Sequence, residues 1–201
     1  MLRAESLACR RGRRIIFRDV SFAVNAGDVL RITGRNGSGK TSLLRLLAGF
    51  LPVFGGALYW NDKVVTDATA YRTYLHYIGH LDALKPELTA GETISYWRTL
   101  RSVTASPDVL EPFGLAELAD RPVRYFSAGQ KRRLVLARLS VTDAPLWLLD
   151  EPLTALDQKG QLLLASLIAA HQAKGGMIVI ATHHDLDFEN IKILALDGAA
   201  G

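Results

Sequence analysis

The residue types and spacing that point most directly to chemistry lie in GRNGSGKT, residues 34–41. This stretch fits the pattern G-x-x-x-x-G-K-[ST], follows the β-like run VLRIT and opens a leucine-rich helical pattern. In such a loop the backbone amides of the glycine turn and of the helix start cradle phosphates. We expect Lys40 to span the β- and γ-phosphates of a nucleotide and Thr41 to ligate Mg²⁺. The alternative is a chance glycine-rich turn, with odds below roughly one per cent in a chain of this length. The predicted nucleotide-binding residues of the loop are Gly34, Arg35, Asn36, Gly37, Ser38, Gly39, Lys40 and Thr41.

The stretch PLWLLDEP, residues 145–152, carries the candidate catalytic carboxylates. Its apolar run predicts a strand that delivers Asp150 and Glu151 at its carboxyl end, where ligands of open α/β sheets bind. We expect Asp150 to hold Mg²⁺ through its hydration shell, and Glu151 to orient or deprotonate an attacking water. An acidic turn after a strand is the alternative, and the phosphate loop in the same chain makes it the weaker one.

A third apolar run, VIATHHD, also ends in polar residues. We expect His183 to hydrogen-bond the γ-phosphate and the catalytic water. Two adjacent histidines can suggest a metal site, but neighbours on an extended chain point to opposite sides. No cysteine supports a metal site there, so we expect His184 to be exposed.

The stretch YFSAGQKRR, residues 125–133, predicts a helix start that could also bind an anion. Ser127 and Gln130 have the spacing of an S-x-x-Q capping box. That box gives no reason for Ala128-Gly129, because glycine in a helix costs roughly 1 kcal/mol against alanine. A bare helix N-terminus with small residues and nearby cations is a ready anion site.

The elements that must position these residues follow an alternation of strands and helices. The predicted strands are residues 15–17, 20–24, 29–33, 57–60, 74–78, 146–150 and 177–182, and a last run that starts at Ile191. Helices are predicted after Gly39, from a Thr89-x-x-Glu92 capping box and from about Gln158, with residues 81–141 mostly helix and loop. Continuous apolar strands between helices predict an α/β fold with a parallel sheet covered by helices.

Composition and charge indicate one globular unit with no sign of disorder. The 201 residues are enough for one good core and marginal for two, and apolar residues make up 49%. The net charge of +4 is mild, and the clusters RRGRR and KRR more often form a solvated face than a nucleic-acid or membrane surface. Because Cys9 is the only cysteine, no intrachain disulfide can form, which indicates a reducing compartment. We expect no nucleic acid partner.

No segment predicts insertion into a membrane. The N-terminal MLRAESLACRRGRR lacks the apolar core of a signal peptide. The longest apolar run, residues 162–170, is nine residues, against about 20 for a membrane span. Any membrane association is therefore expected to be peripheral and to depend on a partner. The absence of C-x-x-C-H also predicts no covalently attached haem.

The phosphate loop, SAGQ, LLDEP, LTALD and ATHHD occur in the order and spacing of ATP-binding-cassette ATPases, and the chain resembles that family over essentially its whole length. The resemblance implies a P-loop NTPase core, with an N-terminal antiparallel β subdomain and an inserted α-helical subdomain. It implies one domain over residues 1–201, with the core at 1–80 and 142–201 and the helical signature subdomain at 81–141. The cofactors it implies are ATP and Mg²⁺.

The same resemblance implies that two copies of the chain work together. FSAGQ resembles the signature motif, which in this family contacts the γ-phosphate of ATP bound to a second subunit. LTALD resembles the loop that crosses the dimer interface, and Asp157 ends it. The implied signature residues are Ser127, Ala128, Gly129 and Gln130.

A closer resemblance is carried by YIGHLDALKPELTAGETI, SAGQKRRLVLARL and DEPLTALD. They look like the ATP-binding subunit of the cytochrome c maturation system, the haem exporter ATPase family. This implies work beneath polytopic membrane subunits, on the cytoplasmic face of the bacterial inner membrane. There ATP hydrolysis is linked to release of a haem-loaded chaperone, and the subunit itself is not expected to bind haem.

The sequence departs from the broad cassette pattern at four positions. His80 stands where most members carry a glutamine that contacts Mg²⁺ and the membrane subunit, which is similar to the cytochrome c maturation branch. Arginine replaces the usual adenine-stacking aromatic, at Arg11 or one residue earlier at Arg10, and a planar guanidinium can stack on a ring. Phe126 replaces a leucine, and Arg35 a proline.

Two other function classes stay open at this point. One is the same machine in another small-molecule or lipoprotein exporter. The other is a soluble cassette protein of translation or DNA repair, which would explain the basic clusters. Proteins of that class usually carry two cassettes or long insertions, and this chain has neither.

Overall fold

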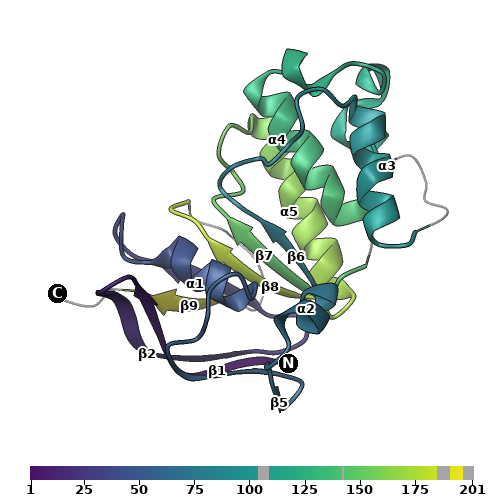
Figure 1. Cartoon of the computed structure of the whole chain (residues 1–201). Coiled ribbons are helices and arrows are strands. Elements are labelled where there is room, and N and C mark those ends of the chain that lie inside the picture. Colours follow the sequence, from purple (N-terminus) through teal and green to yellow (C-terminus); the bar gives the residue numbers. More distant parts are fainter. Residues whose placement is uncertain (104–108, 142, 185–190, 197–201) are drawn as a thin grey trace. The chain divides into compact units, whose positions relative to one another are not determined.

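The computed structural model describes residues 1–103, 109–141, 143–184 and 191–196. Contacts within the chain divide it into two compact units (Figure 1). The first unit comprises Met1–Tyr77, Ala144–Pro152 and Ile168–Gly201, and the second comprises Ile78–Asp143 and Leu153–Leu167. The predicted domain boundaries stay a prediction.

The first unit contains an antiparallel sheet, as the family resemblance implied. Its order is β2-β1-β4-β5, built from β1 (Leu2–Arg11), β2 (Arg14–Val24), β4 (Gly55–Trp60) and β5 (Lys63–Val64). The short runs predicted at 15–17 and 20–24 are one strand, β2, which pairs antiparallel with β1.

Strand β1 was absent from the sequence-based prediction, and its irregular register explains why. Leu2 and Ala4 are buried in strict alternation, but Leu7, Ala8 and Cys9 are buried in succession. The register shifts between Ala4 and Leu7, where Ser6 adopts a positive φ of 44°. A β-bulge of this kind breaks the period of two that identifies a half-buried strand.

The parallel sheet of the first unit has the order β6-β7-β8-β3-β9. These strands are β6 (Leu75–Ile78), β7 (Leu146–Asp150), β8 (Met177–Ala181), β3 (Val29–Thr33) and β9 (Ile191–Ala195). The pairs β7–β8, β8–β3 and β3–β9 are parallel, which confirms the predicted sheet type. Every residue of β7 and β8 is buried, as expected for strands covered on both faces.

Helix α1 (Lys40–Leu47) forms the centre of the first unit's core. It contacts β7 and β8 of the parallel sheet and β1 of the antiparallel sheet, so it lies between the two sheets (Figure 1). Leu43, Leu44, Leu46 and Leu47 are all buried. The short helix α2 (Ala68–Tyr71) and the 3₁₀ turn η1 (Arg72–Tyr74) precede β6, and α5 (Gln158–Ala173) precedes β8.

The second unit is largely helical. It contains α3 (Ala90–Leu100), α4 (Ala128–Ala137) and the first part of α5. The 3₁₀ turns between them are η2 (Glu111–Phe113), η3 (Ala116–Leu118), η4 (Val123–Tyr125) and η5 (Arg138–Ser140). The predicted capping box of Thr89 and Glu92 is present at the start of α3, with both reciprocal hydrogen bonds.

No helix among the described residues is both long enough and apolar enough to cross a membrane.

An ion pair fixes the start of β3, the strand that leads into the phosphate loop. Asp28 accepts hydrogen bonds from Lys192 Nζ on β9 at 2.6 Å and from the amide of Asn25 at 2.7 Å. Burial opposes ionisation of this carboxyl, but the two donors outweigh burial and hold its pKa below the usual range. The backbone carbonyl of Asp28 also accepts from the amide of Ile178 on β8 at 3.1 Å.

We predict that Lys192→Met lowers the free energy of unfolding at pH 7 by about 0.5–1 kcal/mol, because Lys192 is partly exposed and its charge is screened. A depressed pKa contributes stability above the ordinary aspartate pKa of about 3.9, and this is lost as pH falls through the folded pKa. The difference from wild type should therefore be constant well above pH 4 and shrink progressively as pH falls below about 4 in urea unfolding curves. Lys63→Met, at an exposed lysine of β5, is the matched control and should show no such pH dependence.

Candidate functional site

The phosphate loop has a backbone that only glycine adopts easily. Gly34, Gly37 and Gly39 have φ values of 142°, 82° and 106°. A Cβ at Gly34 would lie 2.3 Å from the carbonyl oxygen of Leu196, and one at Gly39 would lie 2.6 Å from Ile16 Cγ2. These glycines let the loop turn tightly against the first unit's core.

Lys40 is the first residue of α1 and is only 9% exposed. Its Nζ donates to the carbonyl of Gly34 at 2.8 Å and to that of Arg35 at 3.2 Å. Ser38 Oγ is buried and has no hydrogen-bond partner among the described residues. A buried ammonium and a buried hydroxyl without a partner, both within three residues of a helix N-terminus, fit a phosphate group. Arg35 and Asn36 are exposed on the loop.

Thr41 and Asp150 meet, as a shared Mg²⁺ site requires. Thr41 Oγ1 donates to Asp150 Oδ1 at 3.2 Å, which joins the start of α1 to the end of β7. Asp150 is 2% exposed. A hydroxyl and a carboxylate are the hard oxygen ligands that Mg²⁺ prefers alongside phosphate and water. The residues present therefore fit the ion.

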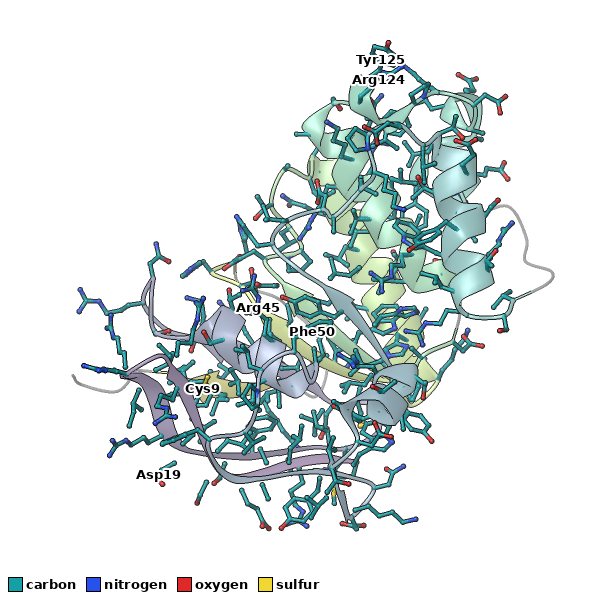
Figure 2. The ribbon with its side chains drawn as sticks, viewed as in Figure 1. Cys9, Asp19, Arg45, Phe50, Arg124 and Tyr125 are labelled. Atoms are coloured by element: carbon teal, nitrogen blue, oxygen red, sulfur yellow. The ribbon has the colours of Figure 1, made fainter. Side chains whose placement is uncertain are left out.

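Tyr77, whose pKa feels the charge of Asp150, and its partner Arg45 were missed by the sequence-based prediction. Tyr77 on β6 is a hydrogen-bond partner of the Arg45 side chain, which lies on α1 (Figure 2). Burial raises the pKa of Tyr77, the charge of Asp150 adds to that effect, and Arg45 opposes it. The ring of Tyr77 also packs edge-on against Phe50, with centroids 5.4 Å apart. Contacts of this kind have no local sequence pattern.

Glu151 and His183 lie close together in the first unit. Glu151 Oε1 is 3.5 Å from His183 Nε2, and the two side chains are 19% and 53% exposed. Glu151 has a left-handed φ of 47°, while its amide still donates to the carbonyl of Ala181 at 2.8 Å. Residues held in sparsely populated backbone regions cluster at active sites. His184 is exposed, as expected, and Asp185 of the same motif lies outside the described residues.

The signature residues form the start of α4 in the second unit. Ser127 is the N-cap, its Oγ accepts from the amide of Gln130 at 3.2 Å, and Gln130 Oε1 accepts from the amide of Ser127 at 2.8 Å. The predicted capping box is therefore present. Ser127 and Ala128 are exposed. Just before them, the guanidinium of Arg124 lies 5.0 Å from the ring centroid of the exposed Tyr125 (Figure 2).

Gly129 has a packing reason that the sequence did not reveal. A Cβ at this position would lie 3.2 Å from the backbone carbonyl oxygen of Ala155. Ala155 belongs to the LTALD loop and has a left-handed φ of 63°. The loop thus approaches the first turn of α4 closely within the same unit.

Asp157 acts locally as a helix cap. Its Oδ1 accepts from the amide of Gly160 at 2.8 Å, in the first turn of α5. The side chain is otherwise exposed. The predicted role of Asp157 at a dimer interface stays a prediction. The helix cap is a second, structural role of the same side chain.

The two remaining predicted residues are exposed. Arg11 ends β1 and pairs with Arg14 across the hairpin, whereas the guanidinium of Arg10 lies 4.4 Å from the ring centroid of Phe54. His80 is the second residue after β6 and lies in the second unit.

The predicted residues thus fall into two groups, each inside one unit. Lys40, Thr41, Asp150, Glu151 and His183 lie in the first. The signature residues, Asp157 and His80 lie in the second.

Sequence comparisons point to one group of transport ATPases. The family model described as ABC transporter matches residues 17–154. A "Cytochrome c biogenesis ATP-binding export protein CcmA" from Rhodospirillum rubrum is 48% identical over 196 residues, covering 96% of this chain and 84% of the relative. The protein of that name from Paramagnetospirillum magneticum is 45% identical over 201 residues, covering 96% and 93%.

Solved structures agree on the fold. The ATP-binding subunit of an ABC transporter superposes with a TM-score of 0.84 at 25% identity, covering 90% of this chain and 79% of that chain. A dimeric ATP-binding cassette in a post-hydrolysis state, bound to ADP and phosphate, superposes with a TM-score of 0.83 at 22% identity, covering 98% and 94%. The second likeness shows the P-loop NTPase fold alone. On these sequence matches, the chain belongs to the ABC transporter family, in the group of cytochrome c biogenesis ATP-binding export proteins.

Proposed function

We propose that the chain is the ATP-hydrolysing subunit of a cytochrome c maturation exporter, working in pairs beneath polytopic membrane subunits. The observation that carries the catalytic part is the meeting of Thr41 with Asp150, and of Glu151 with His183, beside a buried Lys40. The names of the relatives support the pathway. We place the protein peripherally on the cytoplasmic face of the bacterial inner membrane, with ATP as substrate.

Binding of ATP begins at the phosphate loop. The ammonium of Lys40 would exchange the carbonyls of Gly34 and Arg35 for phosphate oxygens, and loop amides would donate to the same group. Ser38 Oγ, buried and without a partner among the described residues, would gain an acceptor. Thr41 and Asp150 would hold Mg²⁺, with His80 as a further contact. Bound Mg²⁺ would neutralise developing charge on the phosphates.

We assign adenine stacking to Arg11. The ring of Phe54 already lies beneath the guanidinium of Arg10. Arg11 lies at the exposed end of the β1–β2 hairpin, and its planar group can stack on a base.

Hydrolysis requires a positioned water and a proton acceptor. Glu151 would accept the proton as the water attacks, and its strained left-handed backbone is typical of an active-site residue. His183, 3.5 Å from that carboxylate, would donate a hydrogen bond to the γ-phosphate and fix the position of Glu151. Phosphoryl transfer depends mainly on positioning and charge stabilisation, which these groups supply.

The second half of the site would come from a second copy of the chain. The hydroxyl of Ser127 accepts one bond within the capping box and can still donate its own proton to a phosphate. The first-turn amides of Ala128 and Gly129 cannot be satisfied by the helix's own ladder. Asp157 would lie at the same interface.

Another exporter of the same type is the second candidate, because its ATP chemistry would be identical. The names of the relatives favour cytochrome c biogenesis over it. The soluble translation or repair class has no support from those names. That the chain binds neither nucleic acid nor haem directly stays a prediction.

The chemistry is tested with two substitutions in the purified protein. Lys40→Ala should lose nucleotide affinity and hydrolysis together, because the buried ammonium binds the phosphates. Glu151→Gln should keep ATP binding but lower kcat by roughly 10²–10⁴, the usual contribution of a general base. Glu117→Gln, at an exposed position in η3, is the matched control. Wild-type turnover in Glu151→Gln would show that the proton acceptor is misassigned.

The composite site is tested with Ser127→Arg. ATP binding by the monomer should stay nearly intact, while ATP-driven dimerisation in the Glu151→Gln background should be abolished. The reason is that bulk and charge replace a small residue where a phosphate must approach. Ser140→Arg, on the exposed side of η5, makes the same change as a control. Nucleotide binding and sedimentation are the two measurements. If a folded Ser127→Arg protein no longer binds ATP as a monomer, the two-copy arrangement is contradicted.

The pathway is tested through His80 in a bacterium that lacks its own copy of this gene. His80→Ala should leave ATP binding intact but reduce c-type cytochrome assembly, whereas His80→Gln should recover much of it, because an amide offers a similar acceptor. His184→Ala is the control at another exposed histidine. The coupling role is refuted if His80→Ala supports normal cytochrome levels by haem staining. Failure of the wild-type chain to restore any c-type cytochrome would refute the pathway itself.

A further inference from the structure

One buried arginine of the signature helix holds the segment that carries His80. Arg132 lies on α4, two residues after Gln130, and its side chain is only 3% exposed. Its Nη1 donates to the carbonyl of Gly79 at 3.1 Å and to Asp82 Oδ1 at 3.2 Å. These two acceptors stand on either side of His80 in the sequence.

The environment makes this contact strong. A buried guanidinium must be neutralised and hydrogen-bonded, since an unsatisfied charge in an apolar interior is very unfavourable. Asp82 supplies the opposite charge and Gly79 a backbone acceptor. Both contacts therefore hold the segment and the helix to each other.

The held segment has little regular structure of its own. Residues 79–85 form neither helix nor strand, and Ala83 has a positive φ of 49°. Leu81 is 79% exposed. Regular backbone ladders therefore do not fix the positions of residues 79–82, which makes a side-chain anchor more important.

We propose that Arg132 is a positioning residue that couples His80 to the signature residues Ser127–Gln130 at the start of its own helix. This proposal rests on the proposed function. If His80 responds to ATP bound in its own chain, Arg132 passes a displacement of residues 79–82 to α4. The helix start then meets the partner copy's nucleotide only when the chain's own site is filled. The expected consequence is cooperative hydrolysis by the two copies.

The geometry distinguishes Arg132 from its neighbour. Arg133 Nη1 donates to the carbonyl of Phe113 at 3.0 Å, at the turn η2. Both arginines anchor α4, but the bonds described above join only Arg132 to residues 79–82. Arg133 is therefore a matched control for charge, helix position and anchoring.

The experiment measures ATP affinity, kcat and the Hill coefficient of hydrolysis in the full chain. Arg132→Gln should lower kcat roughly three- to thirtyfold, the range of known coupling residues. ATP affinity of the monomer should change less than about twofold, and the Hill coefficient should fall from about 2 toward about 1. Arg132→Lys should recover part of the wild-type behaviour, since a single nitrogen of Arg132 serves both acceptors and a lysine ammonium carries three donors. Arg133→Gln should leave the Hill coefficient unchanged.

A double-mutant cycle separates coupling from general damage. If Arg132 acts through His80, the variant His80→Ala with Arg132→Gln should be no slower than the worse single variant. Multiplicative effects would overturn the proposal, as would an unchanged Hill coefficient in Arg132→Gln. Asp82→Asn, which keeps an acceptor but removes the charge, should show a weaker form of the same split. If Arg132→Gln does not fold, the Hill coefficient of Asp82→Asn decides between coupling and general damage.

Failure of the proposed function would look different. In that case the wild-type chain would itself neither bind nor hydrolyse ATP. The coupling proposal fails alone when the wild type hydrolyses ATP cooperatively and both Arg132→Gln and Asp82→Asn do the same.

Discussion

A buried ammonium is the constraint on which the nucleotide side of this molecule depends. Lys40 is 9% exposed, so its charge must be surrounded by acceptors. Without phosphate, the carbonyls of Gly34 and Arg35 fill that role. Those carbonyls can face the ammonium because the loop passes through left-handed conformations at its glycines. Lys40 and the loop glycines thus depend on each other. Together they fix the start of α1, where Thr41 donates to Asp150.

Local signals explain what the sequence could predict. The phosphate loop, the Thr89 and Ser127 capping boxes and the buried strands β7 and β8 each depend on residues within a few positions of one another. Strand β1 was missed because a bulge near Ser6 breaks its alternation. Tyr77 with Arg45, and Arg132 with Gly79, were missed because they join residues far apart in the sequence. Such contacts depend on the fold and leave no periodic pattern.

The resemblance to a family supplied roles that spacing alone could not. Glu151 and His183 are separate motifs in the sequence, and only the fold brings their side chains to 3.5 Å. For Asp157 the family suggests an interface role, whereas the coordinates add a local one, since its carboxylate caps α5. A residue with a structural and a functional role is constrained twice. Its substitution therefore has to be interpreted with stability measured alongside activity.

The cap of α5 also bears on why Ser127 and Gly129 occupy the start of α4. Both helix N-termini lie in the second unit, and both carry a partial positive charge. At α5 the carboxylate of Asp157 meets that charge, so an external anion would be repelled. At α4 the cap is a neutral hydroxyl, and the first-turn residues are small. Gly129 fits the close approach of the Ala155 carbonyl, which offsets its helix cost of roughly 1 kcal/mol. Of the two termini, only that of α4 is left able to attract a phosphate.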